Sequence, residues 1–394
     1  MGEAKDTAGI ALFFMAGTAA GEWLVSGPVP PEHRHILASA SMMFFASAAI
    51  AAGLTKETGQ RRTVSVMSLF ALAGLLCRVS VSIHGGISVF QGSLPAEALA
   101  SMSGKFKDLI DSVPYRDSDS AAIIKALISG DRSDVSPHIR AAFRDSGASH
   151  ILALSGMHLG IIYAILLKLL SVFGNTPAAR KARSVSIIAI SAWYTAVTGA
   201  ASSLVRALLF ITLSETARLT GRETRPMNIF FISLTIQLAV SPENITSAGF
   251  QLSYLAMAGI YILYPKMKSW FPDPDSGTTW IPEANHGQAA GSNGQTPALN
   301  RRRGPMKRLW DAAALTIACQ VFTAPAAWIH FGTFPEYFII TNLLAVPLSN
   351  FIMITSVGVI SLSALGICPS FLIDLDCFCI GLLKDILMTI RTLN

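Results

Sequence analysis

The stretch Ser149-His-Ile-Leu-Ala-Leu-Ser-Gly-Met-His-Leu-Gly160 decides the fold class of this chain. It continues without a charged residue to Leu167, which makes it long and apolar enough to cross a membrane as a helix. It nevertheless carries two histidines and a serine. Polar side chains in hydrocarbon cost free energy unless they face protein, water or a transported solute. The stretch therefore indicates a function inside a lipid bilayer.

The composition of the whole chain points the same way. Only 14% of the 394 residues are charged, against roughly 25% in soluble domains. The apolar residues form blocks of roughly 18 to 22, the length that spans hydrocarbon as a helix. We therefore predict an all-α, polytopic transmembrane helical bundle. The net charge of +6 is weak support for a nucleic-acid partner, because membrane proteins concentrate Lys and Arg in cytoplasmic loops. The five cysteines form no CxxC pair, so we expect neither a metal site nor a cofactor.

Apolar blocks predict about eleven transmembrane spans. Basic residues follow the second, fourth, sixth and eighth blocks, for example Arg61 and Arg180. Because such residues mark the cytoplasmic side, the N-terminus is predicted to be cytoplasmic. The predicted spans are 8–25, 36–54, 64–83, 149–170, 184–200, 203–219, 227–241, 247–265, 310–329, 338–363 and 371–390.

Three regions follow from this topology. Residues 1–83 form N-terminal transmembrane helices, residues 84–148 form an extracytoplasmic segment, and residues 149–391 form a second transmembrane domain. The extracytoplasmic segment has two amphipathic stretches, 95–113 and 118–130, which we expect on the membrane surface or over a pore mouth. Ser136-Pro137 predicts the start of a short helix that Gly147 ends. Within the second domain, the polar loop 270–308 is expected to be cytoplasmic and disordered.

The central stretch presents its polar residues together if it is one continuous helix. His150 and His158 then lie roughly 80° apart, and Ser155 shares their face. Gly156 and Gly160 form a G-x-x-x-G pair, which predicts close approach of a neighbouring helix. The polar side chains then either line a path through the membrane or only make hydrogen bonds between helices.

Two catalytic alternatives exist for the same residues. Ala153-Leu-Ser-Gly156 is similar to the G-x-S-G of intramembrane serine proteases, with His330 or His158 as the base. Its first glycine is missing, and no oxyanion-hole donor can be named. A metal site at His150 and His158 would need further ligands that the sequence does not offer.

Other polar residues also fall within apolar blocks. Arg206 follows Ser202-Ser203, about one turn inside the predicted span, where it either snorkels to water or contacts a polyanion. Gln251 and Asn342 lie near span ends. Residues 199–203 form either a turn between two crossings or a re-entrant segment. Together these residues indicate a polar path, without naming what moves along it.

Four ordered motifs closely resemble the competence domain of the ComEC family, the bacterial inner-membrane channels that import single-stranded DNA during natural transformation. The similarity covers roughly residues 104–365. The motifs are Ala126-Leu-Ile-Ser-Gly-Asp-Arg-Ser133 with Ile139–Gly160, Gly199-Ala-Ala-Ser-Ser-Leu-Val-Arg-Ala207, Gly249-Phe-Gln-Leu-Ser-Tyr-Leu-Ala256 and Asn342-Leu-Leu-Ala-Val-Pro347.

The resemblance implies that spans four to ten form a channel for one DNA strand in the bacterial cytoplasmic membrane. It implies a cytoplasmic helicase-like ATPase motor and a periplasmic DNA receptor as partners. Single-stranded DNA, membrane lipid, a separate nuclease and a second copy of the chain are further candidate partners. The resemblance places Asp131 and Arg132 in a pore-mouth motif. Its channel or DNA-path candidates are His150, Ser155, His158, Arg206, Gln251 and Asn342, with Gly156 and Gly160 as helix-packing positions.

The chain departs from the family pattern in two places. Residues 84–103 are too few for the OB-fold that many members carry, and no H-x-H-x-D-H motif of a metallo-β-lactamase-like domain is present. We therefore expect a short form that lacks both domains and has no nuclease activity or other catalytic residue. One alternative is a transporter or scaffold of the same fold that moves another solute. The second alternative is the intramembrane serine hydrolase.

Overall fold

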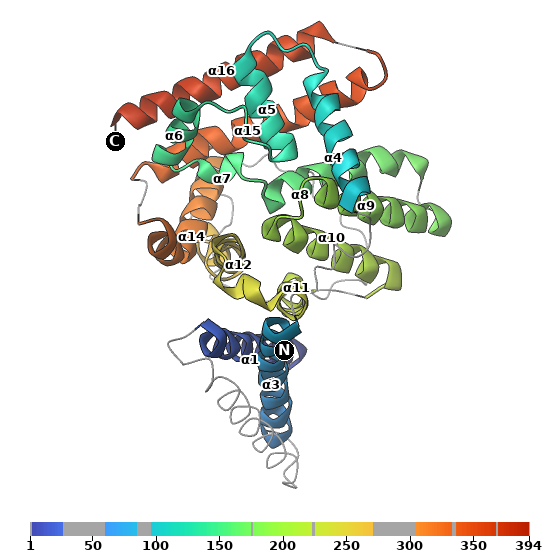
Figure 1. Ribbon diagram of the computed structural model, residues 1–394, viewed down its shortest axis with the longest axis vertical. Helices are drawn as coiled ribbons and strands as arrows, with labels where there is room; N and C mark the ends of the chain where they lie inside the picture. The colour runs from blue at the N-terminus through green and yellow to red at the C-terminus, as the bar shows by residue number, and fades with distance from the viewer. Residues whose placement is uncertain are drawn as a thin grey trace, which may run out of the picture.

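The computed structural model describes residues 2–26, 60–84, 96–174, 176–222, 225–270, 305–332, 336–367 and 369–393. Within these ranges the regular elements are all helical, which confirms the predicted all-α class (Figure 1). The helices are α1 (Gly2–Ser26), α3 (Gln60–His84), α4 (Ala96–Asp111), α5 (Ser118–Ser129), α6 (Pro137–Asp145), α7 (Ser149–Leu152), α8 (Gly156–Leu170), α9 (Pro177–Val197), α10 (Ser202–Thr220), α11 (Pro226–Val240), α12 (Ala248–Ile262), α13 (Tyr264–Lys268), α14 (Pro305–Phe331), α15 (Phe338–Ser363) and α16 (Ser370–Leu393), with short 3-10 turns at Ser171–Phe173 and Pro242–Thr246.

Four helical segments are long and apolar enough to cross a membrane, namely Thr7–Ser26, Gly156–Phe173, Met306–Phe331 and Phe338–Ser363. Three shorter apolar helices, Val66–Ser82, Pro226–Val240 and Ala248–Ile262, accompany them. These seven segments overlap seven of the predicted spans, and they identify the chain as a membrane protein. The predicted span 36–54 and most of the predicted loop 270–308 lie outside the described residues.

Three other predicted spans form helices that are not among these candidates. The blocks 184–200 and 203–219 correspond to α9 and α10, and the block 371–390 corresponds to α16. Charged side chains interrupt all three helices. The residues between α9 and α10 form a turn, in which Gly199 and Ala200 both adopt positive φ values of 88° and 49°. Residues 199–201 thus form a turn between two helices, and whether these helices are two membrane crossings stays a prediction.

The first two described helices pack tightly against each other. A Cβ on Gly17 would lie 1.8 Å from the carbonyl oxygen of Ala71, and one on Gly74 would lie 2.2 Å from that of Phe14. Only glycine allows the two backbones to approach this closely. An ion pair between Glu22 and Arg78 joins the same two helices. The α1–α3 pair then packs on α11 and on the turn after it.

Five of the helices that follow the α1–α3 pair form a closed ring. Helix α8 contacts α10, α10 contacts α12, α12 packs along α14, α14 contacts α15, and α15 returns to α8. Figure 1 shows these helices around a common centre, with α11 beside α10 and α12. Glu215 of α10 fixes one end of this arrangement, since it accepts hydrogen bonds from Tyr163 Oη (2.7 Å) in α8 and Ser184 Oγ (2.6 Å) in α9. The fold thus surrounds a centre with helices from four separate motifs.

A layer of helices that we call the cap covers one side of the ring (Figure 1). The cap consists of α4, α5, α6 and α16, and it contains the largest hydrophobic cluster of the described residues. Helix α5 is the centre of this cluster, with Ile123 and Ile124 fully buried and even Ser120 only 2% exposed. The stretch 118–130, predicted to lie on the membrane surface or over a pore mouth, is a buried helix of the cap, because α15 and α16 cover its second face.

Helix α16 lies along the other helices of the cap over its whole length. Asp374, Lys384 and Arg391 form ion pairs with Arg116 (2.7 Å), Asp119 (2.8 Å) and Asp145 (3.1 Å) respectively. The first and last of these α16 residues are about 26 Å apart at 1.5 Å per residue. These contacts place α16 along the other cap helices, and α16 is not among the candidate membrane spans, so the span at 371–390 stays a prediction.

The start of α6 agrees with the sequence. Ser136 is the N-cap residue, and its hydroxyl accepts the N–H of Ile139 at 3.4 Å, while Pro137 is the first helical residue. Gly147 follows the helix with a φ of 80°. This short helix leads directly into the central stretch.

Candidate functional site

The central stretch is not one continuous helix. Helix α7 ends at Leu152, Ala153 and Ser155 have extended backbones, and α8 begins at Gly156. The predicted 80° relation between the two histidines therefore does not hold. A broken helix at membrane depth is tolerated where it is buried in protein or lines a cavity.

Side chains from distant segments satisfy the backbone groups at this break. Arg132 Nε donates to the carbonyl oxygen of Leu152 at 3.1 Å, and Ser203 Oγ donates to that of Leu154 at 2.8 Å. The Arg132 bond joins the cap to the break, and the Ser203 bond joins α10 to it. The break is thus built by contacts between motifs rather than by a local helix-breaking residue.

The two histidines have different environments. His158 is 1% exposed, and its Nδ1 accepts the backbone N–H of Ser155 at 3.0 Å. Ser155 Oγ lies 3.2 Å from the same nitrogen. His158 therefore caps the first turn of α8, in the manner of a capping box. His150 is exposed, with Nδ1 3.2 Å from the carbonyl oxygen of Gly147. Among the described residues no group of three His, Cys, Asp or Glu side chains could hold a metal ion.

The two glycines of α8 also differ. A Cβ on Gly156 would lie 2.9 Å from Arg206 Nη2 and 3.3 Å from the Cβ of Ala207, so the absence of a side chain allows α10 to approach here. A Cβ on Gly160 would meet nothing within 4 Å. The predicted packing seam is therefore confirmed at Gly156 and wrong at Gly160, which faces open space one turn further along.

Arg206 is the most unusual side chain of the site. It is 7% exposed, and its Nη1 has no hydrogen-bond partner among the described residues. Its guanidinium carbon lies 5.7 Å from the centre of the Tyr254 ring. An arginine at membrane depth costs about 2.5–3.5 kcal/mol on insertion scales. A cation–π contact offsets roughly 1–2 kcal/mol of that cost. The rest of the cost of burying the Arg206 charge is not offset by this contact.

Two residues that were not selected from the sequence complete the surroundings of Arg206. Gln237 of α11 is 3% exposed, and its Nε2 donates to the carbonyl oxygen of Ser202 at 3.1 Å. Tyr254 Oη donates to Gln237 Oε1 at 3.0 Å. The signal was available, because Gln237 is an amide within the apolar block 226–240. These bonds fix the N-terminal turn of α10, from which Arg206 projects.

Gln251 lies in α12 and joins two other segments. Its Nε2 donates to the carbonyl oxygen of Ile245 at 2.7 Å, and its Oε1 lies 2.9 Å from His330 Nε2 in α14. His330, one of the two bases considered for a serine hydrolase, therefore faces Gln251. Asn342 of α15 has a buried Oδ1 with no hydrogen-bond partner in the described part of the chain.

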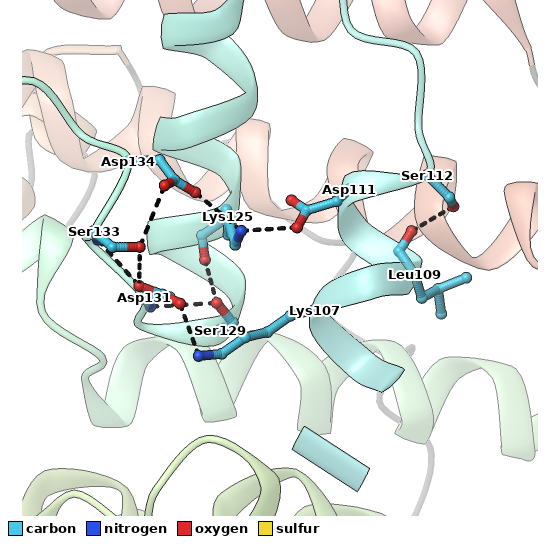
Figure 2. Close-up of polar contacts among 9 residues, drawn as sticks. All are labelled: Lys107, Leu109, Asp111, Ser112, Lys125, Ser129, Asp131, Ser133 and Asp134. Atoms are coloured by element: carbon cyan, nitrogen blue, oxygen red, sulfur yellow. Dashed lines mark hydrogen bonds and ion pairs between the residues drawn. The ribbon is translucent and has the colours of Figure 1, made fainter. Parts of the chain in front are cut away.

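The residues Asp131 and Arg132 connect the cap to the ring. Asp131 Oδ1 accepts both the N–H (3.0 Å) and the hydroxyl (2.7 Å) of Ser133, and its Oδ2 accepts Lys107 Nζ at 2.7 Å (Figure 2). Hydrogen bonds from Lys107 and Ser133 hold the pKa of Asp131 well below its usual range. The turn that Asp131 organises places Arg132 against the end of α7.

Lys125 of α5 makes a second group of contacts beside it. Its Nζ donates to Asp111 at 2.7 Å and to Asp134 at 2.9 Å (Figure 2). Hydrogen bonds to these two carboxylates raise the pKa of Lys125 above its ordinary value. The charged residues of this part of the cap are thus paired with one another and hold α4, α5 and the following turn together.

Three of the four sequence motifs meet at one place. Leu154 and Gly156 of the first motif contact Ser203 and Arg206 of the second. A Cβ on Gly249 of the third motif would lie 3.1 Å from Ser202 Oγ. We call this place, where α8, α10 and α12 converge, the motif junction. The fourth motif lies on α15, which contacts α8.

Comparisons with known proteins agree with this arrangement. A family model described as "Competence protein" matches residues 127–394. The chain is 33% identical over 136 residues to ComE operon protein 3 of Bacillus subtilis (strain 168), covering 34% of this chain and 17% of that protein. It is 25% identical over 249 residues to the uncharacterized protein YcaI of Escherichia coli (strain K12), covering 59% and 28%.

The matched part thus spans less than a third of either relative. No solved structure matches the chain. The family match covers more than half of the chain, from α5 through α16, and includes all of the motif junction. The chain therefore belongs to the competence protein family, as the sequence motifs predicted.

Proposed function

We propose that this protein takes part in competence DNA uptake as an inner-membrane channel for one DNA strand. The observation that carries the proposal is the closed ring of α8, α10, α12, α14 and α15, with a buried arginine at its motif junction whose Nη1 has no hydrogen-bond partner in the described ranges. Membership of the competence family and the similarity to ComE operon protein 3 support it.

The contacts available to a strand would be few and individually weak. A channel needs groups that bind its cargo well enough to admit it and weakly enough to release it. Arg206, Gln251, Asn342 and the exposed His150 fit this requirement better than a continuous basic groove would. A phosphate backbone supplies the complementary charge.

The remaining partners follow from the same proposal. We place the cap on the extracytoplasmic side, since the basic residues of the predicted topology mark the opposite side as cytoplasmic, and there it would contact a DNA receptor. A cytoplasmic ATPase motor would pull the strand, and a separate nuclease would degrade its complement. The protein itself would then need no catalytic residue.

Uptake of labelled DNA tests the proposal. A strain that lacks this gene is expected to transform poorly and to accumulate little nuclease-resistant labelled strand in the cytoplasm, and the wild-type chain should restore both. The variant Arg144→Gln is a matched control, since this arginine is exposed and its side chain forms an ion pair with the neighbouring Asp145 at 3.1 Å. Normal internalisation in the deletion strain would contradict the proposal and favour a transporter of another solute or a scaffold.

The hydrolase alternative has its own test. Ser155 lies 3.2 Å from His158, but that imidazole nitrogen already accepts a backbone N–H. We therefore propose that Ser155 caps α8 and is not a nucleophile. A fluorophosphonate probe should leave the protein unlabelled, and labelling that disappears in Ser155→Ala would overturn this part of the proposal.

A further inference from the structure

Two positively polarised groups converge at the motif junction. The N–H groups of Gly156 and Met157 at the start of α8 have no intrahelical acceptor, whereas that of His158 bonds to the carbonyl oxygen of Ser155, and the helix dipole adds a partial positive charge there. The Arg206 guanidinium lies against the same turn, with Nη2 2.9 Å from the position of a Cβ on Gly156. Such a pair repels unless a negative group lies between or beside them.

Among the described residues, Nη1 of Arg206 has no carboxylate or other acceptor within hydrogen-bond distance. The nearest carboxylate on α10 is Glu215, about 14 Å further along the helix axis, and it already accepts hydrogen bonds from Tyr163 and Ser184. Arg206 Nη1 has no partner in the described ranges although the side chain is 93% buried. The Tyr254 ring stabilises one face of the guanidinium but accepts no hydrogen bond from Nη1.

Resting on the proposed function, we propose that Arg206 and the first turn of α8 together bind one phosphodiester group of the DNA strand. Helix N-termini bind phosphate through their free N–H groups, and guanidinium binds it through paired N–H donors. A single phosphodiester carries one negative charge, which matches one arginine and one helix end. Gly156 would be required because its missing side chain leaves room beside the guanidinium.

Strand binding by the full-length protein in phosphatidylcholine nanodiscs tests the proposal. The probes are a fluorescein-labelled oligothymidylate and the same oligomer with uncharged methylphosphonate linkages. Arg206→Gln should weaken binding of the phosphodiester strand about tenfold, the loss of one charged hydrogen bond, and leave the methylphosphonate strand unchanged. The slope of log K against log salt should fall by about 0.7, the value for one phosphate contact on a single strand.

Two glycine variants in the same helix provide a matched pair. Gly156→Ala should weaken phosphodiester binding, since its Cβ would displace the guanidinium, whereas Gly160→Ala should not, since its Cβ meets nothing within 4 Å. Both changes add the same helix propensity. If Arg206→Gln does not fold, Arg206→Lys keeps the charge, and the glycine pair tests the same contact.

Each other outcome has a defined meaning. Equal weakening of both probes, or no weakening of either, would overturn the phosphate site. An effect of Arg206→Gln that appears only in nanodiscs with phosphatidylglycerol would identify the anion as a lipid headgroup and overturn the strand assignment. A wild-type protein that binds neither probe would contradict the proposed function itself, and that result is distinguishable from a failure of this site alone.

Discussion

Replacing Asp131 separates two contributions to the stability of the cap. Its two carboxylate oxygens have different partners, since Oδ1 accepts both bonds from Ser133 and Oδ2 accepts the bond from Lys107. Asparagine can keep the Oδ1 contacts and removes only the ion pair. Alanine removes all three bonds. The two variants should therefore differ in stability by the value of the Ser133 contacts.

The magnitudes follow from burial and bond type. The ion pair is partly exposed, with Lys107 at 37% and Asp131 at 20% of side-chain area, so its loss in Asp131→Asn should cost about 1 kcal/mol or less. Each Ser133 hydrogen bond contributes roughly 0.5–1.5 kcal/mol. Asp131→Ala should therefore cost about 1–4 kcal/mol.

Thermal unfolding in detergent and hydrogen exchange of the α4 and α5 amides measure these costs. Lys107→Met should be about as destabilising as Asp131→Asn, and the double variant should cost little more than either, because both remove the same ion pair. Equal destabilisation by asparagine and alanine would refute the reasoning, since it would mean that the Ser133 turn contributes nothing.

Three further predictions concern the pH dependence of stability, the topology of α16 and the role of His158 at the N-terminus of α8. Because the folded pKa of Asp131 is lowered, its contribution to stability is complete above the unfolded pKa of about 3.9 and is lost as the pH falls through the folded pKa. When unfolding is measured at decreasing pH, Asp131→Asn should therefore lose less stability in acid than the wild type. Single cysteines at Phe371 and Thr392, the two ends of α16, should react with a membrane-impermeant maleimide from the same side, and labelling from opposite sides would support the predicted span. His158→Gln should keep near-normal thermal stability, since its amide can accept the Ser155 N–H, whereas His158→Ala should lose about 1 kcal/mol; equal losses would remove the capping role.

The parts of the fold that the sequence predicted are those set by local chemistry. Ser136-Pro137 begins α6 because both residues act within one turn, and the positive φ at Gly199 marks the turn between α9 and α10. The apolar blocks that became α14 and α15 needed only their length and composition. Such signals lie within a few neighbouring residues and can be read without knowing the fold.

The parts that the sequence did not reveal depend on distant partners. The break after Leu152 contains no proline, and it exists because Arg132 and Ser203, which lie 20 and 49 residues from the carbonyls they bind, hold those oxygens. The charges of α16 are stabilised by bonds to other residues of the cap. The partners of Asp374 and Lys384 lie more than 200 residues earlier in the chain. No periodicity in the sequence carries that information.

The candidate residues divide along the same line. The sequence singled out Arg206 and Gly156 separately, since a charge and a glycine in an apolar block are visible in isolation, and only the structure shows that they are neighbours. It grouped His150 with His158, although one is exposed and the other is a buried capping residue. A shared helix was assumed, and the tertiary contacts at Leu152 and Leu154 removed it.

The glycine seam of α1 and α3 requires no residue of the family-matched region 127–394. During synthesis the two helices can therefore pair as soon as both have left the ribosome and entered the bilayer, before any part of the ring exists. Phe14 of this pair then packs with Phe230 and Leu234 of α11, in one hydrophobic cluster. A pair that forms early would offer α11 a surface on which to dock when it is made.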